Sequence, residues 1–151
     1  MCAPAEQNYA AEERIDDQGI GDEDRLLRYC RTPIQVVPCP INGQRLSSQA
    51  FRPGKVEKNV SVDLECLMHQ DGLPTDARYG AMPNTFALAA ISARNAREHA
   101  NGVAWTPKPE HPGAVGAAES ANKYHGEVIG PLSKRSYQNL AEQVSLIRDD
   151  L

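Results

Sequence analysis

The sequence predicts an α+β domain in which a small mixed sheet carries two main helices. Short β-branched segments are typical of strands, and two longer segments have apolar residues at helical spacing. The chain's 11 glycines and 11 prolines separate these segments by turns. A chain of 151 residues has the size of one ordinary domain. The predicted elements are strands, a helix, further strands and a terminal helix. This order favours helices packed on a mixed sheet.

The N-terminal segment, residues 1–21, is acidic and has little apolar periodicity. It carries the pairs Glu12-Glu13 and Asp16-Asp17. Such a segment buries too little apolar surface to order itself. We therefore expect a flexible acidic arm, removable without unfolding the single domain formed by residues 22–151.

Strands are predicted in the first half of the domain over residues 26–30, 34–37 and 60–64. The last of these alternates apolar and polar residues, as a half-buried strand does. An acidic start also makes residues 22–31 compatible with a short helix, but the strand is favoured. Residues 45–51 fit a loop or a short strand, and residues 65–68 begin a helix.

The two main helices are predicted over residues 84–99 and 133–150. Asn84 and Ser133 are suitable N-caps, and Gly102 follows the first helix. In the second, apolar residues recur every three or four positions, which predicts one buried stripe. Short strands at residues 103–105 and 127–129 lie between them, separated by a Pro/Gly/Ala-rich loop over residues 107–120.

Composition excludes some classes of protein. A net charge of −4 argues against nucleic-acid binding, which usually needs a basic patch. No segment has the ~18 apolar residues of a membrane span, and the first residues lack the pattern of a signal peptide. We therefore expect a cytoplasmic protein without membrane contact. The four cysteines are accordingly interpreted as free thiols, with Cys30 and Cys66 buried.

Polar residues at the ends of short strands are the candidates for chemistry. His125 is a candidate general acid or base, with Asn122 to orient it. Ser48 is a candidate nucleophile, and Ser47 and Ser48 together can bind phosphate. Asp63 is a candidate carboxylate in a cleft. Each has a structural alternative: a turn bond to the backbone, a loop-fixing hydrogen bond or a place on the solvent face.

Candidate binding residues are three arginines and one serine. Arg28, Arg45 and Arg97 can clamp a carboxylate or phosphate, or can form structural salt bridges. Ser61 lies on the predicted strand of residues 60–64. If strand ends open onto one rim, Arg45, Ser48 and Asp63 lie near Asn122 and His125.

No cofactor and no metal site are expected. The sequence contains no Gly-rich phosphate loop, no G-x-S-x-G and no H-E-x-x-H motif. The other histidines, His69, His99 and His111, are not at ligand spacing.

Three segments in order resemble a group of small uncharacterised bacterial proteins. They are the R-x-S-S-x-x-F segment at residues 45–51, the S-V-D of residues 61–63, and the N-x-x-H of residues 122–125, with Leu-Leu-Arg at 26–28 opening the domain. The group has N-P-x-H, so Lys123 departs from its pattern. The resemblance covers roughly residues 25–145 and implies a shared fold unit, without an activity.

Two functions are compatible with these observations. The missing catalytic motifs, the acidic arm and the small size favour a binding or accessory module that engages a protein partner, encoded nearby, through a polar cleft. The alternative is a small enzyme acting on a nucleotide or other anionic substrate. One version resembles ADP-ribosyltransferases, which order Arg, Ser and Glu along the chain as Arg28, Ser61 and Glu127 are ordered here.

Overall fold

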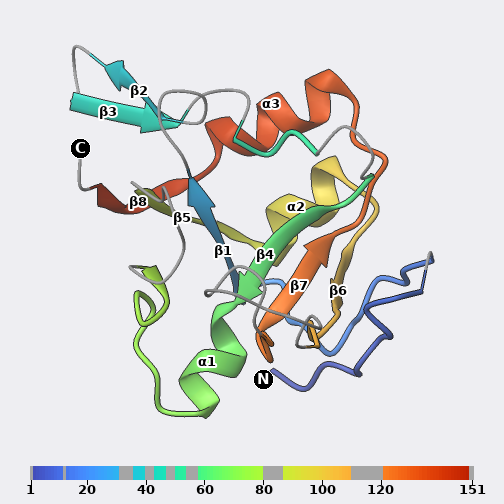
Figure 1. Cartoon of the computed structure of the whole chain (residues 1–151). Helices are drawn as coiled ribbons and strands as arrows, with labels where there is room; N and C mark the ends of the chain where they lie inside the picture. The colour runs from blue at the N-terminus through green and yellow to red at the C-terminus, as the bar shows by residue number, and fades with distance from the viewer. Residues whose placement is uncertain are drawn as a thin grey trace.

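Six antiparallel strands form the central sheet, in the order β6-β7-β4-β1-β5-β8 (Figure 1). The structure is a computed structural model and describes residues 2–11, 13–30, 36–39, 43–46, 50–53, 58–79, 87–109 and 121–149. The strands of the sheet are β1 (Arg25–Cys30), β4 (Val60–Leu64), β5 (Ala87–Ser92), β6 (Val103–Trp105), β7 (His125–Val128) and β8 (Ser145–Asp149). A separate hairpin and three helices complete the fold: β2 (Val36–Cys39), β3 (Gly43–Leu46), α1 (Glu65–Gln70), α2 (Ala93–His99) and α3 (Lys134–Glu142).

The α+β class is confirmed, but the sheet differs from the expected mixed one. Every pairing between its six strands is antiparallel. A parallel pair needs a crossover helix between neighbouring strands. Here α2 joins β5 to β6 and α3 joins β7 to β8, and neither pair is adjacent in the sheet.

The predicted helix over residues 84–99 is wrong in its first half. Residues 87–92 form β5, and the helix begins only at Ala93, capped by Ser92, whose hydroxyl accepts from the Asn95 N–H at 3.1 Å. All of residues 87–91 are buried, because apolar clusters pack against both faces of β5. A run of apolar residues without alternation does not distinguish such a strand from a helix. The expected cap, Asn84, lies outside the described residues.

The terminal helix is shorter than predicted. Ser133 caps α3 as expected, and its hydroxyl accepts from the Ser136 N–H. The helix ends at Glu142, and residues 145–149 continue as the edge strand β8, paired with β5. Ile147 continues the helical spacing in sequence, yet it packs against the sheet as part of a strand. Pairing with the free edge of β5 therefore overrides the local helical pattern.

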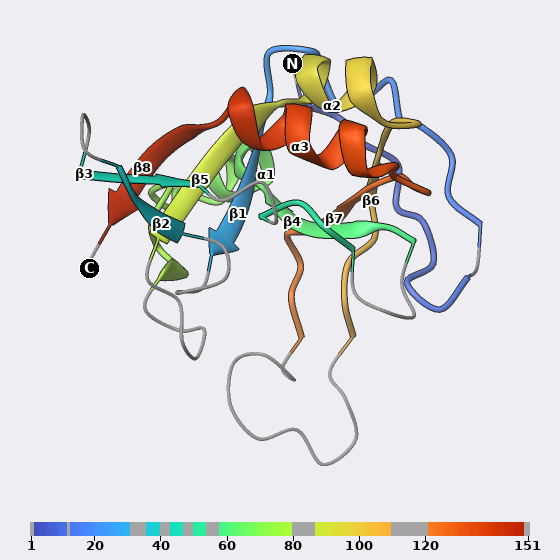
Figure 2. The ribbon, with the colours of Figure 1, turned by 90° about the horizontal axis from the view of Figure 1, so that it is seen from above.

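Two cores lie on opposite faces of the sheet. The larger core lies under α2 and α3, which cover one face (Figure 2), and it contains Leu26, Val62 and Leu140. The smaller core, on the other face, contains Leu27 and Leu88 together with Met68 of α1. Side chains of a strand alternate between faces, and β1 and β5 contribute buried apolar residues to both cores.

The N-terminal segment runs along the outer edge of β6. Its backbone bonds to that strand at two places, Gln7 N to Trp105 O (2.9 Å) and Asp17 N to Val103 O (2.8 Å). Ile20 is 1% exposed and belongs to the larger core. Covering an edge strand in this way satisfies its free N–H and C=O groups. These contacts argue against a loose arm, and the division at residue 21 stays a prediction.

Gly102 allows the closest approach between the arm and the domain. Its φ of 131° is a conformation that side chains rarely adopt. A Cβ there would lie 2.4 Å from the Cβ of Asp16. The same Asp16 accepts from Val103 N at 2.9 Å, so the glycine lets the arm and β6 meet.

A disulfide joins Cys2 to Cys66, with the Cα atoms 5.8 Å apart. The prediction of free thiols at Cys2 and Cys66 is therefore wrong, whereas Cys30 is free and buried as expected. The partners are 64 residues apart in sequence, so the pairing depends on the path of the arm past α1. Disulfides are rare in reducing compartments, so this bond runs against the expected cytoplasmic location, which stays a prediction.

Leu140, at 0% exposure, provides a test of the larger core. Leu140→Ala should lower the free energy of unfolding by about 2–5 kcal/mol, because it leaves a cavity beneath α3. Urea denaturation measures the change. Glu142→Ala on the exposed side of the same helix is the control, expected within about 0.5 kcal/mol of wild type. Equal stability of the two variants would contradict the packing of α3.

Candidate functional site

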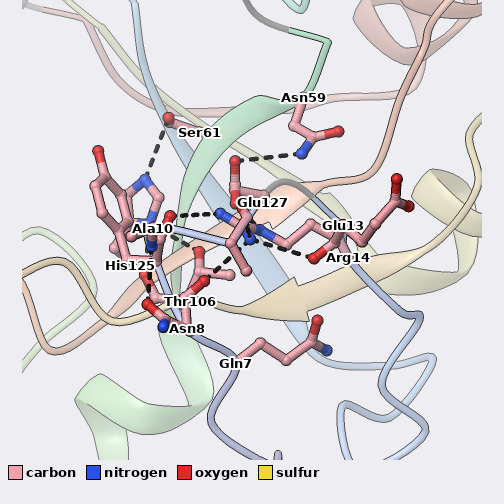
Figure 3. A network of polar contacts seen from close by, with 12 residues as sticks. Gln7, Asn8, Ala10, Glu13, Arg14, Asn59, Ser61, Thr106, His125 and Glu127 are labelled. Atoms are coloured by element: carbon pink, nitrogen blue, oxygen red, sulfur yellow. Dashed lines mark hydrogen bonds and ion pairs between the residues drawn. The ribbon is translucent and has the colours of Figure 1, made fainter.

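The pairing of β4 with β7 gathers polar side chains on the sheet face opposite α2 and α3. Ser61 lies across from Glu127, and Asp63 across from His125. Their neighbours Val60, Val62 and Leu64 point to the larger core. Because alternate residues share a face, these four polar side chains form one surface. Figure 3 shows three of them, Ser61, His125 and Glu127.

His125 is held in one tautomer by the backbone. Its Nδ1 lies 2.8 Å from the carbonyl oxygen of Thr106, which can only accept, so Nδ1 carries the proton. The Thr106 hydroxyl lies 3.0 Å from the same nitrogen. The unprotonated Nε2 therefore faces Ser61, whose hydroxyl donates to it across 3.2 Å.

The environment of His125 favours the neutral imidazole. Burial lowers its pKa, and this outweighs the bond to the Thr106 carbonyl and the charges of Glu127 and Asp63, which raise it. The ring of Tyr9, from the arm, lies edge-on to the imidazole with ring centroids 5.3 Å apart. Ser61 itself is exposed. A neutral, oriented base thus contacts a hydroxyl that solvent can reach, the arrangement that activates a serine nucleophile.

Asp63 is the centre of a buried hydrogen-bond cluster beside this pair. The residue is 3% exposed. Tyr29 Oη and Arg78 Nε each donate to Oδ2 at 2.8 Å, and Asn122 Nδ2 donates to Oδ1 at 2.8 Å. Burial and the charge of Asp63 raise the pKa of Tyr29. With three donors, the carboxylate is satisfied by the protein itself.

Glu127 is bound by the arm. Arg14 Nε donates to Glu127 Oε1, and the Arg14 side chain is only 5% exposed. Arg14 also donates to the carbonyls of Asn8 (3.0 Å) and Tyr9 (2.8 Å). One guanidinium therefore shapes the loop that carries Tyr9 and fixes it to β7.

The residues predicted from sequence fall into three groups. Ser61, Asp63, Asn122 and His125 lie together, although Asn122 donates to Asp63 and not to the imidazole. Arg28 and Arg97 bind the protein itself. The side chain of Arg45 and all of Ser47 and Ser48 lie outside the described residues.

The two described arginines have structural partners. Arg28 donates to the carbonyls of Ala50 (3.0 Å) and Ser61 (2.8 Å), where β1 and β4 diverge. Arg97 of α2 donates to the carboxylates of Asp16 and Asp22, the latter at 2.7 Å. The clamp predicted for Arg97 thus holds carboxylates of the protein's own N-terminal segment.

Sequence reasoning missed Tyr9, Arg14, Tyr29, Arg78 and Thr106. One signal was available for Arg14, which is the only basic residue among positions 1–21. The only basic side chain of an acidic segment is a candidate for an ion pair with a carboxylate in another part of the chain. Thr106 contributes its carbonyl oxygen, and no side-chain pattern reveals such a role.

Three potential metal ligands form a separate group of side chains. Within the described ranges, a group that could hold an ion consists of Cys2, Asp24 and Cys66. No helix among the described residues is long and apolar enough to cross a membrane.

No protein-family model, curated protein or solved structure matches the chain.

The lowered pKa of His125 predicts a pH effect on stability. The unfolded histidine, with a pKa near 6.5, binds a proton more readily than the folded one. Its stabilising contribution is therefore complete above that pH and is lost as the pH falls through it. His125→Gln should flatten the decline of the melting temperature between about pH 7 and 5. His69→Gln, at an exposed histidine, is the control; an unchanged slope in His125→Gln would contradict the burial argument.

Proposed function

We propose that the protein is a small acyl-transfer enzyme in which the Ser61 hydroxyl is the nucleophile and His125 the general base. The observation that carries the proposal is the bond from the exposed Ser61 hydroxyl to His125 Nε2 at 3.2 Å. It is supported by the lowered pKa of the imidazole and by the Thr106 carbonyl on Nδ1. Together these supply a base that is neutral near pH 7 and already oriented.

The reaction begins as Ser61 Oγ attacks the carbonyl carbon of an ester or thioester and its proton passes to His125 Nε2. The tetrahedral intermediate then collapses, the bond to the leaving group breaks, and the leaving group takes the proton. Water then attacks the acyl carbon and gives a proton to the same nitrogen; the bond to Ser61 Oγ breaks, and this proton passes to Oγ as the acid leaves. The imidazolium formed in between is stabilised by the Thr106 carbonyl and by the charges of Glu127 and Asp63.

A binding or accessory module for a protein partner is the second candidate. It is supported by the Asp63 cluster, in which the carboxylate accepts from three protein donors, as in a structural network. An enzyme acting on a nucleotide, of the ADP-ribosyltransferase kind, has less support. It would need Arg28 and Glu127 to face the ligand, yet they bond to Ser61 O and to Arg14.

An alkyl fluorophosphonate tests the acyl-transfer proposal, because an activated serine displaces fluoride and forms a stable phosphonate ester. Wild-type protein should be modified at Ser61, as mapped by mass spectrometry. Ser61→Ala should abolish labelling, and His125→Gln should slow it by about 100-fold or more. Ser145→Ala, at an exposed serine of β8, is the matched control and should label at the wild-type rate.

Melting temperatures of all variants establish that they are folded. Failure of the folded wild-type protein to label, or labelling that survives Ser61→Ala unchanged, would reject the nucleophile. A large fall in the melting temperature of His125→Gln with no labelling at all would favour a structural network and the binding module.

A further inference from the structure

Cys2, Asp24 and Cys66 bring three metal-ligating atoms together from three segments of the chain. Cys2 lies near the start of the arm, Asp24 directly before β1, and Cys66 in the first turn of α1. The two Sγ atoms and a carboxylate oxygen all lie within 4.8 Å of one another, and all three residues are half-buried. Ligands of a tetrahedral zinc ion with bonds of about 2.0–2.3 Å lie roughly 3.3–3.8 Å apart, so small adjustments would place one ion among them.

The carboxylate is the feature that the disulfide does not explain. A disulfide is neutral and gains nothing from an adjacent anion. Asp24 Oδ2 accepts from Gly21 N at 2.7 Å, which fixes the orientation of the carboxylate. Within the described part of the chain, no cation forms a salt bridge with Asp24. Two thiolates and this carboxylate would together form a strongly anionic site for a divalent cation.

We propose that, in the reduced protein, Cys2, Cys66 and Asp24 bind a thiophilic divalent cation, Zn²⁺ in the first place, with water as the fourth ligand. The disulfide and the metal site are alternative states of the same two sulfurs. A dithiol or phosphine reductant supplies two electrons to break the S–S bond, and two protons from water complete the thiols. Zn²⁺ then displaces both protons as it binds the thiolates.

Both states attach the arm to the domain. The disulfide links positions 64 residues apart, and the metal would link the same positions. Tyr9 and Arg14 follow in the arm and contact His125 and Glu127. Only the reduced, metal-free protein would therefore leave the start of this segment without a covalent or coordinate attachment. The proposal does not depend on the acyl-transfer function.

The experiment uses the full chain reduced with a phosphine and freed of reductant under nitrogen. Zn²⁺ affinity is measured by competition with a chromophoric zinc indicator, and Co²⁺ serves as a spectroscopic probe, because its thiolate charge-transfer band grows with the number of bound sulfurs. The reduced protein should bind one ion, and the oxidised protein should bind at least 100-fold more weakly. Cys2→Ser and Cys66→Ser should each halve the cobalt band and weaken Zn²⁺ binding at least 100-fold.

Matched controls separate the site from other thiols and acids. Asp24→Asn should weaken binding at least tenfold, whereas Glu23→Gln, at the exposed neighbouring carboxylate, should not change it. Cys39→Ser should retain both affinity and spectrum. No binding by the reduced wild type, or affinity unchanged in both cysteine variants, would overturn the site. Equal affinities of Asp24→Asn and Glu23→Gln would overturn the role of the carboxylate.

Discussion

The register between β4 and β7 is the constraint on which the rest of the site depends. It sets Ser61 against Glu127 and Asp63 against His125. A shift of one residue on β4 would turn Ser61 and Asp63 into the larger core and bring Val60, Val62 and Leu64 to the opposite face. The buried Asp63 carboxylate would then lose its three donors, and an unpaired buried charge is costly. The hydrophobic pattern and the polar cluster therefore select the same pairing.

Two arginines hold the acidic N-terminal segment from opposite directions. Arg14 extends from the segment to Glu127, and Arg97 extends from α2 to Asp16 and Asp22. Arg97 also donates to the carbonyls of Asp17 and Ile20. The acidity that suggests disorder in isolation is thus offset by Arg97 of α2 and by the segment's own Arg14. Because Asp16 and Arg97 are 81 residues apart, no local pattern shows the match.

Sequence alone predicts the fold where the local pattern and the packing agree. The alternation in β4 and the cap at Ser133 belong to this class. Prediction from the sequence fails at β5 and β8, where pairing within the sheet overrides a helical pattern. At the site, residue type was enough to select Ser61, Asp63, Asn122 and His125. Their partners could not be selected, because Tyr9, Arg14 and the Thr106 carbonyl approach from distant segments.

Gly102 has a consequence for how this sequence can vary. Its positive φ and the contact with Asp16 leave no room for a side chain. Any substitution there would push Asp16 away from Val103 and from Arg97, which the same carboxylate contacts. A positive φ is strained for any side chain, so relatives that keep this backbone conformation between α2 and β6 should keep this glycine with or without the N-terminal segment. Where a relative has a side chain at this position, its backbone between the helix and the edge strand must follow another path.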